Sequence, residues 1–176
     1  MKTHEFSIVA SGLDPQAEDF ESRFYDAGCD DALVSFQKGH IIVDFSREAA
    51  SFSEALVTAI DGVRRAGAHV ERVEPDPLVS LSDIATRTNM TRAAMTNYAK
   101  GLRGSGFPPP AVKVTSESPL WDWATVASWL FRNSRIERDV LVEAELVKEA
   151  NDAIQQGDRA LDVRLERRMR ALESAG

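Results

Sequence analysis

The chain has 176 residues, of which 43% are hydrophobic and 28% charged, and its formal net charge is −7. This composition excludes global disorder, and no apolar run approaches the roughly 18–20 residues that a membrane span requires. The N-terminus carries Glu5 and Asp14 and does not show the basic–apolar–small pattern of a secretory signal. We therefore expect a cytoplasmic protein of one ordinary or two small domains.

Cysteine and histidine residues give no sign of a metal or catalytic centre. Cys29 is the only cysteine, so an internal disulfide is excluded and Cys29 cannot build a thiolate zinc site alone, and we interpret it as a small buried apolar residue. His4, His40 and His69 lie far apart in the sequence, each in a predicted strand, although a centre could still assemble from them in space. We predict no cofactor, no metal and no catalytic residue.

A strand and a helix are predicted first. Residues 4–10 form the strand, and Asp14-Pro15 then favours a helix with Asp14 as N-cap and Pro15 at the first helical position. Gly28 ends this helix. Its apolar face is expected to hold Ala17, Phe20, Phe24 and Ala27.

A hairpin and a second helix and strand are predicted next. The apolar runs 32–37 and 41–45 are joined through Lys38-Gly39, which is a hairpin signal. Ser51 or Ser53 caps the following helix, Gly67 ends it, and residues 70–73 form the last strand. The buried side of that helix is expected to hold Phe52, Leu56, Ile60 and Val63. The order βαββαβ is typical of a ferredoxin-like domain.

Residues 1–76 are the acidic part of the chain, with fifteen acidic residues against seven basic ones. Such a surface does not suit a nucleic acid. An αβ domain of this kind more often binds a protein partner, a copy of itself or a small ligand. Two interpretations therefore stand for this domain, a folding and pairing module or a ligand sensor.

The segment Glu-Pro-Asp-Pro at residues 74–77 marks a boundary, because its prolines favour an extended backbone and break both flanking elements. Residues 78–133 then reverse the charge, with six basic residues against three acidic ones. We therefore divide the chain into an N-terminal domain (1–76), a central domain (78–133) and a C-terminal part (134–176).

Two short helices are predicted at the start of the central domain. Ser80 or Ser82 caps the first helix, residues 88–90 form the turn, and Thr91 caps a second helix that runs to about Lys100. The side chains expected to pack between the helices are Leu81, Ile84, Ala85, Met90, Ala94, Met95 and Tyr98. This pattern predicts a helix-turn-helix.

A wing is predicted after the second helix. Residues 101–106 are glycine-rich and basic, a Phe-Pro-Pro-Pro run follows, and residues 111–114 alternate as a strand. Residues 115–118 form a polar turn, residues 119–121 begin the return strand, and another helix starts at about Ala124. The core is expected to use Phe107, Trp121, Trp123, Val126, Trp129 and Leu130. The whole arrangement is that of a winged helix.

This segment resembles the winged helix-turn-helix of the MerR superfamily, in the compact form found in AlpA-type and excisionase-type proteins. The matching residues are Ile84-Ala85, the Thr91-led second helix, the Phe-Pro-Pro entry to the wing, Trp121, Val126, Trp129 and Leu130. The whole chain also resembles actinobacterial helix-turn-helix proteins of unassigned role. The resemblance implies DNA binding, but in MerR-type activators this domain opens the chain and a long coiled coil follows it, whereas here a βα domain precedes it.

The candidate DNA contacts lie mainly on the second helix, whose N-terminal turn should enter the major groove. Arg92 is expected to read guanine and Asn97 adenine, with phosphate binding as the alternative role of Arg92. Ala93 and Thr96 lie on the same outward face. Phosphate contacts are expected from Thr91, Lys100 and Arg103, and wing-tip contacts from Lys113, Thr115 and Ser116. These few basic groups predict weak binding by one chain, so we expect a dimer.

The C-terminal part is predicted to form a hairpin of two amphipathic helices, broken at Gly157-Asp158. One apolar stripe holds Ile136, Val140, Val147, Ala150 and Ile154, and the other holds Leu161, Leu165, Met169 and Leu172. A hairpin cannot bury both stripes alone, so it must pack on the other domains or on a second chain. Our hypothesis is that it forms a homodimer interface.

Together these patterns predict an α+β protein with a ferredoxin-like N-terminal domain, a central winged helix-turn-helix and a C-terminal helical hairpin. We expect a sequence-specific transcriptional regulator that reads two half-sites of double-stranded DNA. The alternative is an antitoxin-like or adaptor protein that binds a protein partner through the acidic domain and regulates its own expression. An enzyme is not expected, because the chain has no phosphate-cradling glycine loop, nucleophile elbow or paired carboxylates.

Overall fold

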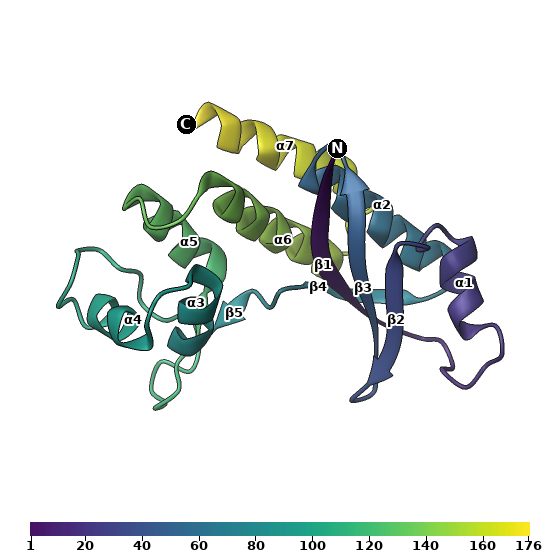
Figure 1. The fold of residues 1–176 in the computed structure, drawn as a ribbon, viewed down its shortest axis with the longest axis horizontal. Coiled ribbons are helices and arrows are strands. Elements are labelled where there is room, and N and C mark those ends of the chain that lie inside the picture. The colour runs from purple at the N-terminus through teal and green to yellow at the C-terminus, as the bar shows by residue number, and fades with distance from the viewer. The chain divides into compact units, whose positions relative to one another are not determined.

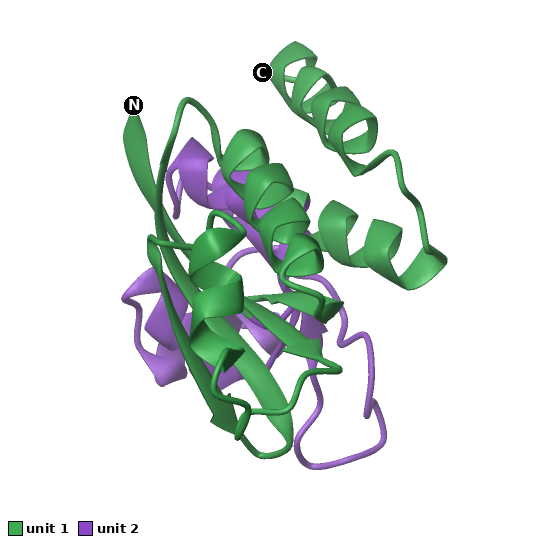
Figure 2. Cartoon of the chain, turned by 90° about the vertical axis from the view of Figure 1, so that its right-hand side faces the viewer, with its two compact units in different colours: residues 1–75, 146–176 green, residues 76–145 purple.

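The computed structural model describes residues 1–176 and contains seven α-helices and a four-stranded antiparallel sheet, which confirms the α+β class. The chain divides into two units: unit 1 comprises residues 1–75 and 146–176, and unit 2 comprises residues 76–145 (Figure 2). The C-terminal part (134–176), expected to be separate, is shared between these units. Helix α6 (Arg138–Gln156) begins in unit 2 and ends in unit 1.

The sheet of unit 1 has the strand order β2-β3-β1-β4 (Figure 1). Its strands are β1 (Lys2–Ser11), β2 (Ala32–Gln37), β3 (His40–Ala49) and β4 (His69–Glu74). The predicted limits of β2 are confirmed, and the other three strands extend beyond their predicted ends. Lys38 and Gly39 both have positive φ, at 52° and 81°, as the tight turn of a β2–β3 hairpin requires.

Helix α2 (Phe52–Arg65) packs on the inward face of this sheet. Ser51 is the N-cap, one of the two predicted alternatives, and its hydroxyl accepts a hydrogen bond from the amide of Glu54 (3.2 Å). Phe6 stacks on Phe45 across the β1–β3 pair and meets Phe52 edge to face, with ring centroids 5.3 and 5.7 Å apart. The buried side chains of α2 include the predicted Phe52, Leu56, Ile60 and Val63.

Helix α1 (Phe20–Asp26) begins later than the sequence predicts. The prediction that Asp14 and Pro15 start the helix is wrong, because the Asp14 carboxylate accepts a hydrogen bond from the amide of Gln16 (2.9 Å) and closes a separate turn. The predicted apolar pair Phe20 and Phe24 is buried. The helix therefore uses the expected face but lacks the expected cap.

The C-terminal part of unit 1 contains the second half of α6 and helix α7 (Leu161–Ser174), separated at Gly157 as predicted. Helix α7 packs on α2 and buries Leu161 and Leu165. The side-chain amide of Asn151 accepts a hydrogen bond from the amide of Val73 (2.7 Å) and donates one to the carbonyl of Val73 (3.1 Å). One edge of the sheet, at β4, is therefore capped by a side chain of α6.

Unit 2 consists of short elements around an aromatic core. Its elements are β5 (Leu78–Val79), α3 (Leu81–Thr88), α4 (Arg92–Ala99), β6 (Trp121–Asp122), α5 (Trp123–Arg132) and the start of α6. The buried core includes Ile84, Ala85, Met95, Tyr98, Trp121, Trp123, Val126, Trp129 and Leu130. All of these core residues were predicted. Strand β5, which pairs with β6, was not predicted.

Candidate nucleic-acid interface

Helix α3 is fixed at both ends by its own sequence. The Ser80 hydroxyl accepts a hydrogen bond from the amide of Asp83 (3.1 Å), and the Asp83 carboxylate accepts hydrogen bonds from the amide and the hydroxyl of Ser80 (both 2.8 Å). This capping box settles the choice between Ser80 and Ser82. Asn89 ends the helix in the left-handed conformation, with φ of 54°, which turns the chain towards α4.

Helix α4 presents a polar face on a firmly held backbone. Thr91 is the N-cap, as predicted, and its hydroxyl accepts a hydrogen bond from the amide of Ala94 (3.1 Å). Met95 and Tyr98 anchor the opposite face, with 0% and 2% of their surfaces exposed. Because one face is buried and the cap is satisfied, the exposed face of α4 is held in a defined orientation.

The predicted contact residues of α4 differ in their surroundings. Thr91, Arg92, Ala93, Asn97 and Lys100 are exposed. Thr96 is half-buried and its hydroxyl donates a hydrogen bond to the carbonyl of Arg92 (3.0 Å). The Arg92 guanidinium donates a hydrogen bond to the hydroxyl of Ser82, a residue of α3 that was considered as a cap but not as a neighbour of the candidate contacts.

The segment after α4 is attached to the core by aromatic residues. The indole of Trp129 donates a hydrogen bond to the carbonyl of Ser105 (2.9 Å), and Gly104 lies against the same ring. The guanidinium of Arg103 lies over the ring of Tyr98, 5.2 Å from its centroid, and remains exposed. Arg103 therefore has a defined position next to the end of α4.

The predicted wing is much less regular than expected. The prediction of a strand at residues 111–114 is wrong, because Val112 forms only an isolated bridge with Leu120. Lys113 has a φ of 55°, which ends the extended conformation at once. The loop still exposes Lys113, Thr115 and Ser116 and is closed by the hydrogen bonds of Val112 and Leu120.

Trp121, which follows the loop, contacts residues far from it in the sequence. The indole of Trp121 donates a hydrogen bond to the carbonyl of Pro108 (3.0 Å), which attaches the proline run to the core. Trp121 itself pairs with Val79 in the β5–β6 ladder. Two residues are too few to give the alternating pattern that predicts a strand, so β5 left no signal in the sequence.

Basic residues dominate residues 80–118, with five Lys or Arg side chains against Asp83 and Glu117. Arg87 has a structural role within unit 2, because its guanidinium lies over the ring of Trp123 (5.3 Å from the centroid) and donates a hydrogen bond to the carbonyl of Asp76 (2.8 Å). The remaining basic side chains, all exposed, are Arg92, Lys100, Arg103 and Lys113. These four belong to α4, to the segment after it and to the closed loop.

The capping box makes the stability of unit 2 depend on pH. The hydrogen bonds from Ser80 hold the pKa of Asp83 below its ordinary value of 3.8. A carboxyl whose pKa is lowered by folding stabilises the protein above its unfolded pKa and loses that contribution as the pH falls through its folded pKa. We expect Asp83→Asn, which keeps an acceptor oxygen but removes the charge from the first helical turn, to cost about 0.5 kcal/mol at pH 7 and nothing at a pH well below 3.

Urea unfolding followed by tryptophan fluorescence measures this effect, because all three tryptophans belong to unit 2. Glu117→Gln is the matched control, since it removes an exposed carboxylate of the same unit, and it should change the stability at neither pH. A D83N variant as stable as the native chain at pH 7 would contradict the role of the capping box.

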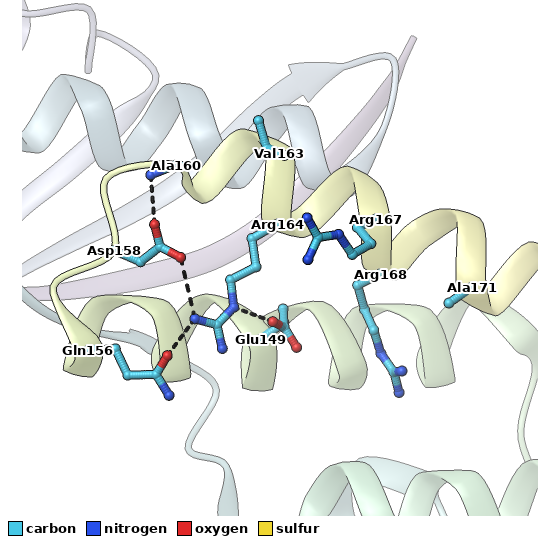
Figure 3. Close-up of a pocket in the computed structure, with 9 residues that line it drawn as sticks. All are labelled: Glu149, Gln156, Asp158, Ala160, Val163, Arg164, Arg167, Arg168 and Ala171. Carbon is cyan, nitrogen blue, oxygen red and sulfur yellow. Dashed lines mark hydrogen bonds and ion pairs between the residues drawn. The ribbon is translucent and has the colours of Figure 1, made fainter.

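A second charged feature lies in unit 1, where α6 and α7 border a cavity of about 490 Å³ (Figure 3). Arg164 of α7 reaches α6, where it donates hydrogen bonds to Glu149 and to Gln156 (2.7 Å), and it also lies 3.5 Å from Asp158. These acidic partners neutralise Arg164 and tie the two helices together. We therefore interpret this arginine as a structural link.

No family model matches the chain, and no curated protein or solved structure is significantly similar to it. None of the seven helices is both long enough and apolar enough to cross a membrane. His, Cys, Asp and Glu side chains do not come together anywhere in groups of three that could hold a metal ion.

Proposed function

We propose that the protein is a cytoplasmic, sequence-specific transcriptional regulator that binds double-stranded DNA through unit 2. In this proposal α3 and α4 form a helix-turn-helix, and the loop closed by Val112 and Leu120 is its wing. The observation that carries the proposal is the construction of α4. One of its faces is locked into the core by Met95 and Tyr98, and the other is exposed and polar.

The proposed roles on α4 follow from side-chain chemistry. Asn97 has an exposed carboxamide, which can donate to and accept from the edge of adenine in the major groove. Arg92 can bind guanine or a phosphate, and either contact requires its guanidinium to leave or share the hydroxyl of Ser82. Ala93 offers a small apolar surface next to a base, and Thr96 supports the backbone of the helix.

The remaining candidates are proposed to bind the DNA backbone. Thr91 and Lys100 lie at the two ends of α4, and Arg103 follows it at a position held by Tyr98. Lys113, Thr115 and Ser116 would reach the minor groove or its phosphates from the wing. The acidic unit 1 is proposed to be a ferredoxin-like domain, because its sheet has the order β2-β3-β1-β4.

Selection of bound DNA from a random pool, with the full chain, tests this function. We expect one enriched motif made of two related half-sites, because a dimer imposes its symmetry on the site. Recovery of no enriched motif would contradict sequence-specific binding. A single unpaired half-site would support α4 as the reading element and contradict the dimer.

Variants then separate base contacts from phosphate contacts. We expect Asn97→Ala to weaken binding to the selected site about 5- to 150-fold and to relax the preference at one base pair. Lys100→Ala should weaken binding to all sequences equally and reduce the salt slope by about one. Arg132→Ala removes another exposed basic residue of unit 2, at the end of α5, and should change neither property. Normal binding by N97A and by Arg92→Ala would contradict the role of α4.

A further inference from the structure

The two edges of the sheet in unit 1 are treated differently. The β4 edge is capped by Asn151, whose side-chain amide hydrogen-bonds to both the backbone N–H and the carbonyl of Val73. Strand β2 forms the other edge, and its sequence, Ala-Leu-Val-Ser-Phe-Gln, contains no charged residue and no proline. Proteins commonly protect an edge strand with charges, proline or a bulge, because its free backbone groups can pair with another strand. Strand β2 has none of these protections.

Apolar side chains surround this edge and are exposed. The exposed fractions are 71% for Leu33, 48% for Phe36 and 66% for Tyr25. A groove of about 440 Å³ lies between α1 and β2, and Phe24, Tyr25, Ala32 and Val34 contribute to its walls. An apolar groove next to an open strand edge provides both the backbone groups and the side-chain pocket that strand pairing uses.

We infer that a second copy of the chain covers this edge, with the two β2 strands pairing antiparallel about a twofold axis at Val34. This inference goes beyond the proposed function, because the strands can pair whether or not unit 2 binds DNA. The two four-stranded sheets would then form one continuous sheet of eight strands. The proposed regulator would thereby gain the second DNA-binding unit that two half-sites require.

The register follows from the two faces of the strand. Ala32, Val34 and Phe36 pair with buried residues of β3 and therefore face inward, towards the helices. Residues directly opposite each other in a ladder share a face, so inward residues of one copy must meet inward residues of the other. With the axis at Val34, Phe36 of each copy lies opposite Ala32 of the other. The large, exposed ring of Phe36 then faces Ala32, the smallest inward side chain of β2, which lines the partner's groove.

Charge supports the same register. An axis at Val34 also brings Lys38, in the turn after β2, to the same end of the paired strands as Asp30 of the other copy, in the turn before β2, which gives two symmetric approaches of opposite charge. Moving the axis to Ser35 keeps the faces correct but places Phe36 opposite Val34 and leaves Lys38 opposite Ala32. Only the axis at Val34 pairs both the ring and the charge with a complementary residue.

The oligomeric state of the full chain tests the inference. We expect a dimer by light scattering during gel filtration, and loss of the dimer in Phe36→Lys, whose ammonium would replace the ring in the partner's groove. Val163→Lys is the matched control, because Val163 is an exposed apolar residue of α7 in the same unit (52% exposed), and it should leave the dimer intact. A monomeric native chain, or a dimer lost in V163K but kept in F36K, would overturn the inference.

Charge exchange tests the register without relying on the folding of a core variant. Lys38→Asp should weaken the dimer, and the same change combined with Asp30→Lys should restore it. Cross-linking provides a second measurement. Directly opposed Cα atoms lie about 4.5–5.5 Å apart in an antiparallel ladder, within the span of a disulfide.

Under mild oxidation, Val34→Cys should therefore form a covalent dimer. Phe36→Cys should not, because the two copies of residue 36 would be about 13 Å apart along the strands. Cys29, which is 2% exposed, should not react in either variant. Failure of both the charge rescue and the Val34→Cys cross-link would overturn the register. F36K should still select the half-site motif, so failure of the dimer is distinguishable from failure of DNA binding.

Discussion

Replacement of Arg47 by methionine is expected to destabilise unit 1 by about 3 kcal/mol, because it leaves a carboxylate without its partner. The Arg47 side chain is 10% exposed, and its guanidinium donates two hydrogen bonds to the carboxylate of Asp31, at 2.8 and 2.7 Å. It also donates to the carbonyl of Gly28 (2.6 Å) and to the hydroxyl of Thr58 (3.1 Å). One side chain thus links β3 to α2 and to the loop before β2.

The rate at which a thiol reagent labels Cys29 reports this loss, because Cys29 is the only thiol and is 2% exposed next to Gly28. A loss of about 3 kcal/mol raises the population of the open unit roughly 100-fold, and labelling should accelerate by a similar factor. Burial raises the pKa of the Cys29 thiol, and the nearby charge of Arg47 opposes that rise. Removing Arg47 makes the thiol itself less reactive, so faster labelling can only come from opening.

Two further variants isolate the contribution of the ion pair between Arg47 and Asp31. Arg72→Met removes an arginine of strand β4 whose side chain is 45% exposed and pairs with Glu74, and it should cost less than about 1 kcal/mol. Combining Arg47→Met with Asp31→Leu removes both charges and should recover most of the lost stability. Labelling of R47M at the rate of the native chain would contradict the prediction.

Local signals in the sequence predicted local structure well. Thr91, and Ser51 as one of two alternatives, were predicted as caps because a hydroxyl before an amphipathic run satisfies free amide groups of the first helical turn. The same signal failed at Asp14, because its carboxylate also satisfies an amide two residues later in a turn that does not continue as a helix. Short-range hydrogen bonding therefore marks the possible starts of a helix, and packing of Phe20 and Phe24 decides which start is used.

Contacts between distant residues were not predictable. Asn151 lies among the apolar residues of α6, and nothing in its neighbourhood indicates that it hydrogen-bonds to Val73, 78 residues away. The pair formed by Arg47 and Asp31 depends in the same way on the register between β2 and β3. Such contacts arise from the tertiary arrangement, which a single sequence does not encode in any fixed spacing.

The candidate interface shows the same division. The exposure of Asn97 and Lys100 followed from helical periodicity, since they lie opposite the buried Met95 and Tyr98. The hydrogen bond between Arg92 and Ser82 could not be predicted from periodicity, because it depends on the angle at which α3 and α4 cross. The predicted strand at residues 111–114 failed because alternation of side chains does not detect the positive φ of Lys113.

Trp129→Ala is expected to have the largest effect on unit 2, with a loss of about 3–5 kcal/mol. Trp129 is 3% exposed and meets the rings of Tyr98 and Phe107 edge to face, at centroid distances of 5.1 Å each. The substitution would leave a cavity between α4 and α5 and would also leave the carbonyl of Ser105 without its donor. We therefore expect both a lower unfolding midpoint and a segment after α4 that is no longer held in position.

Trp129→Phe separates these two effects, because it keeps most of the apolar volume but removes the indole N–H. We expect a loss of about 1–2 kcal/mol for this variant, measured by urea unfolding with the fluorescence of Trp121 and Trp123. If unit 2 binds DNA as proposed, W129F should also lose affinity through Arg103, whose segment the indole holds. Arg103→Ala should then weaken DNA binding less in W129F than in the native chain, since an arginine already out of position has less to lose. Equal effects of R103A in both backgrounds would mean that the indole stabilises the core without orienting the segment after α4.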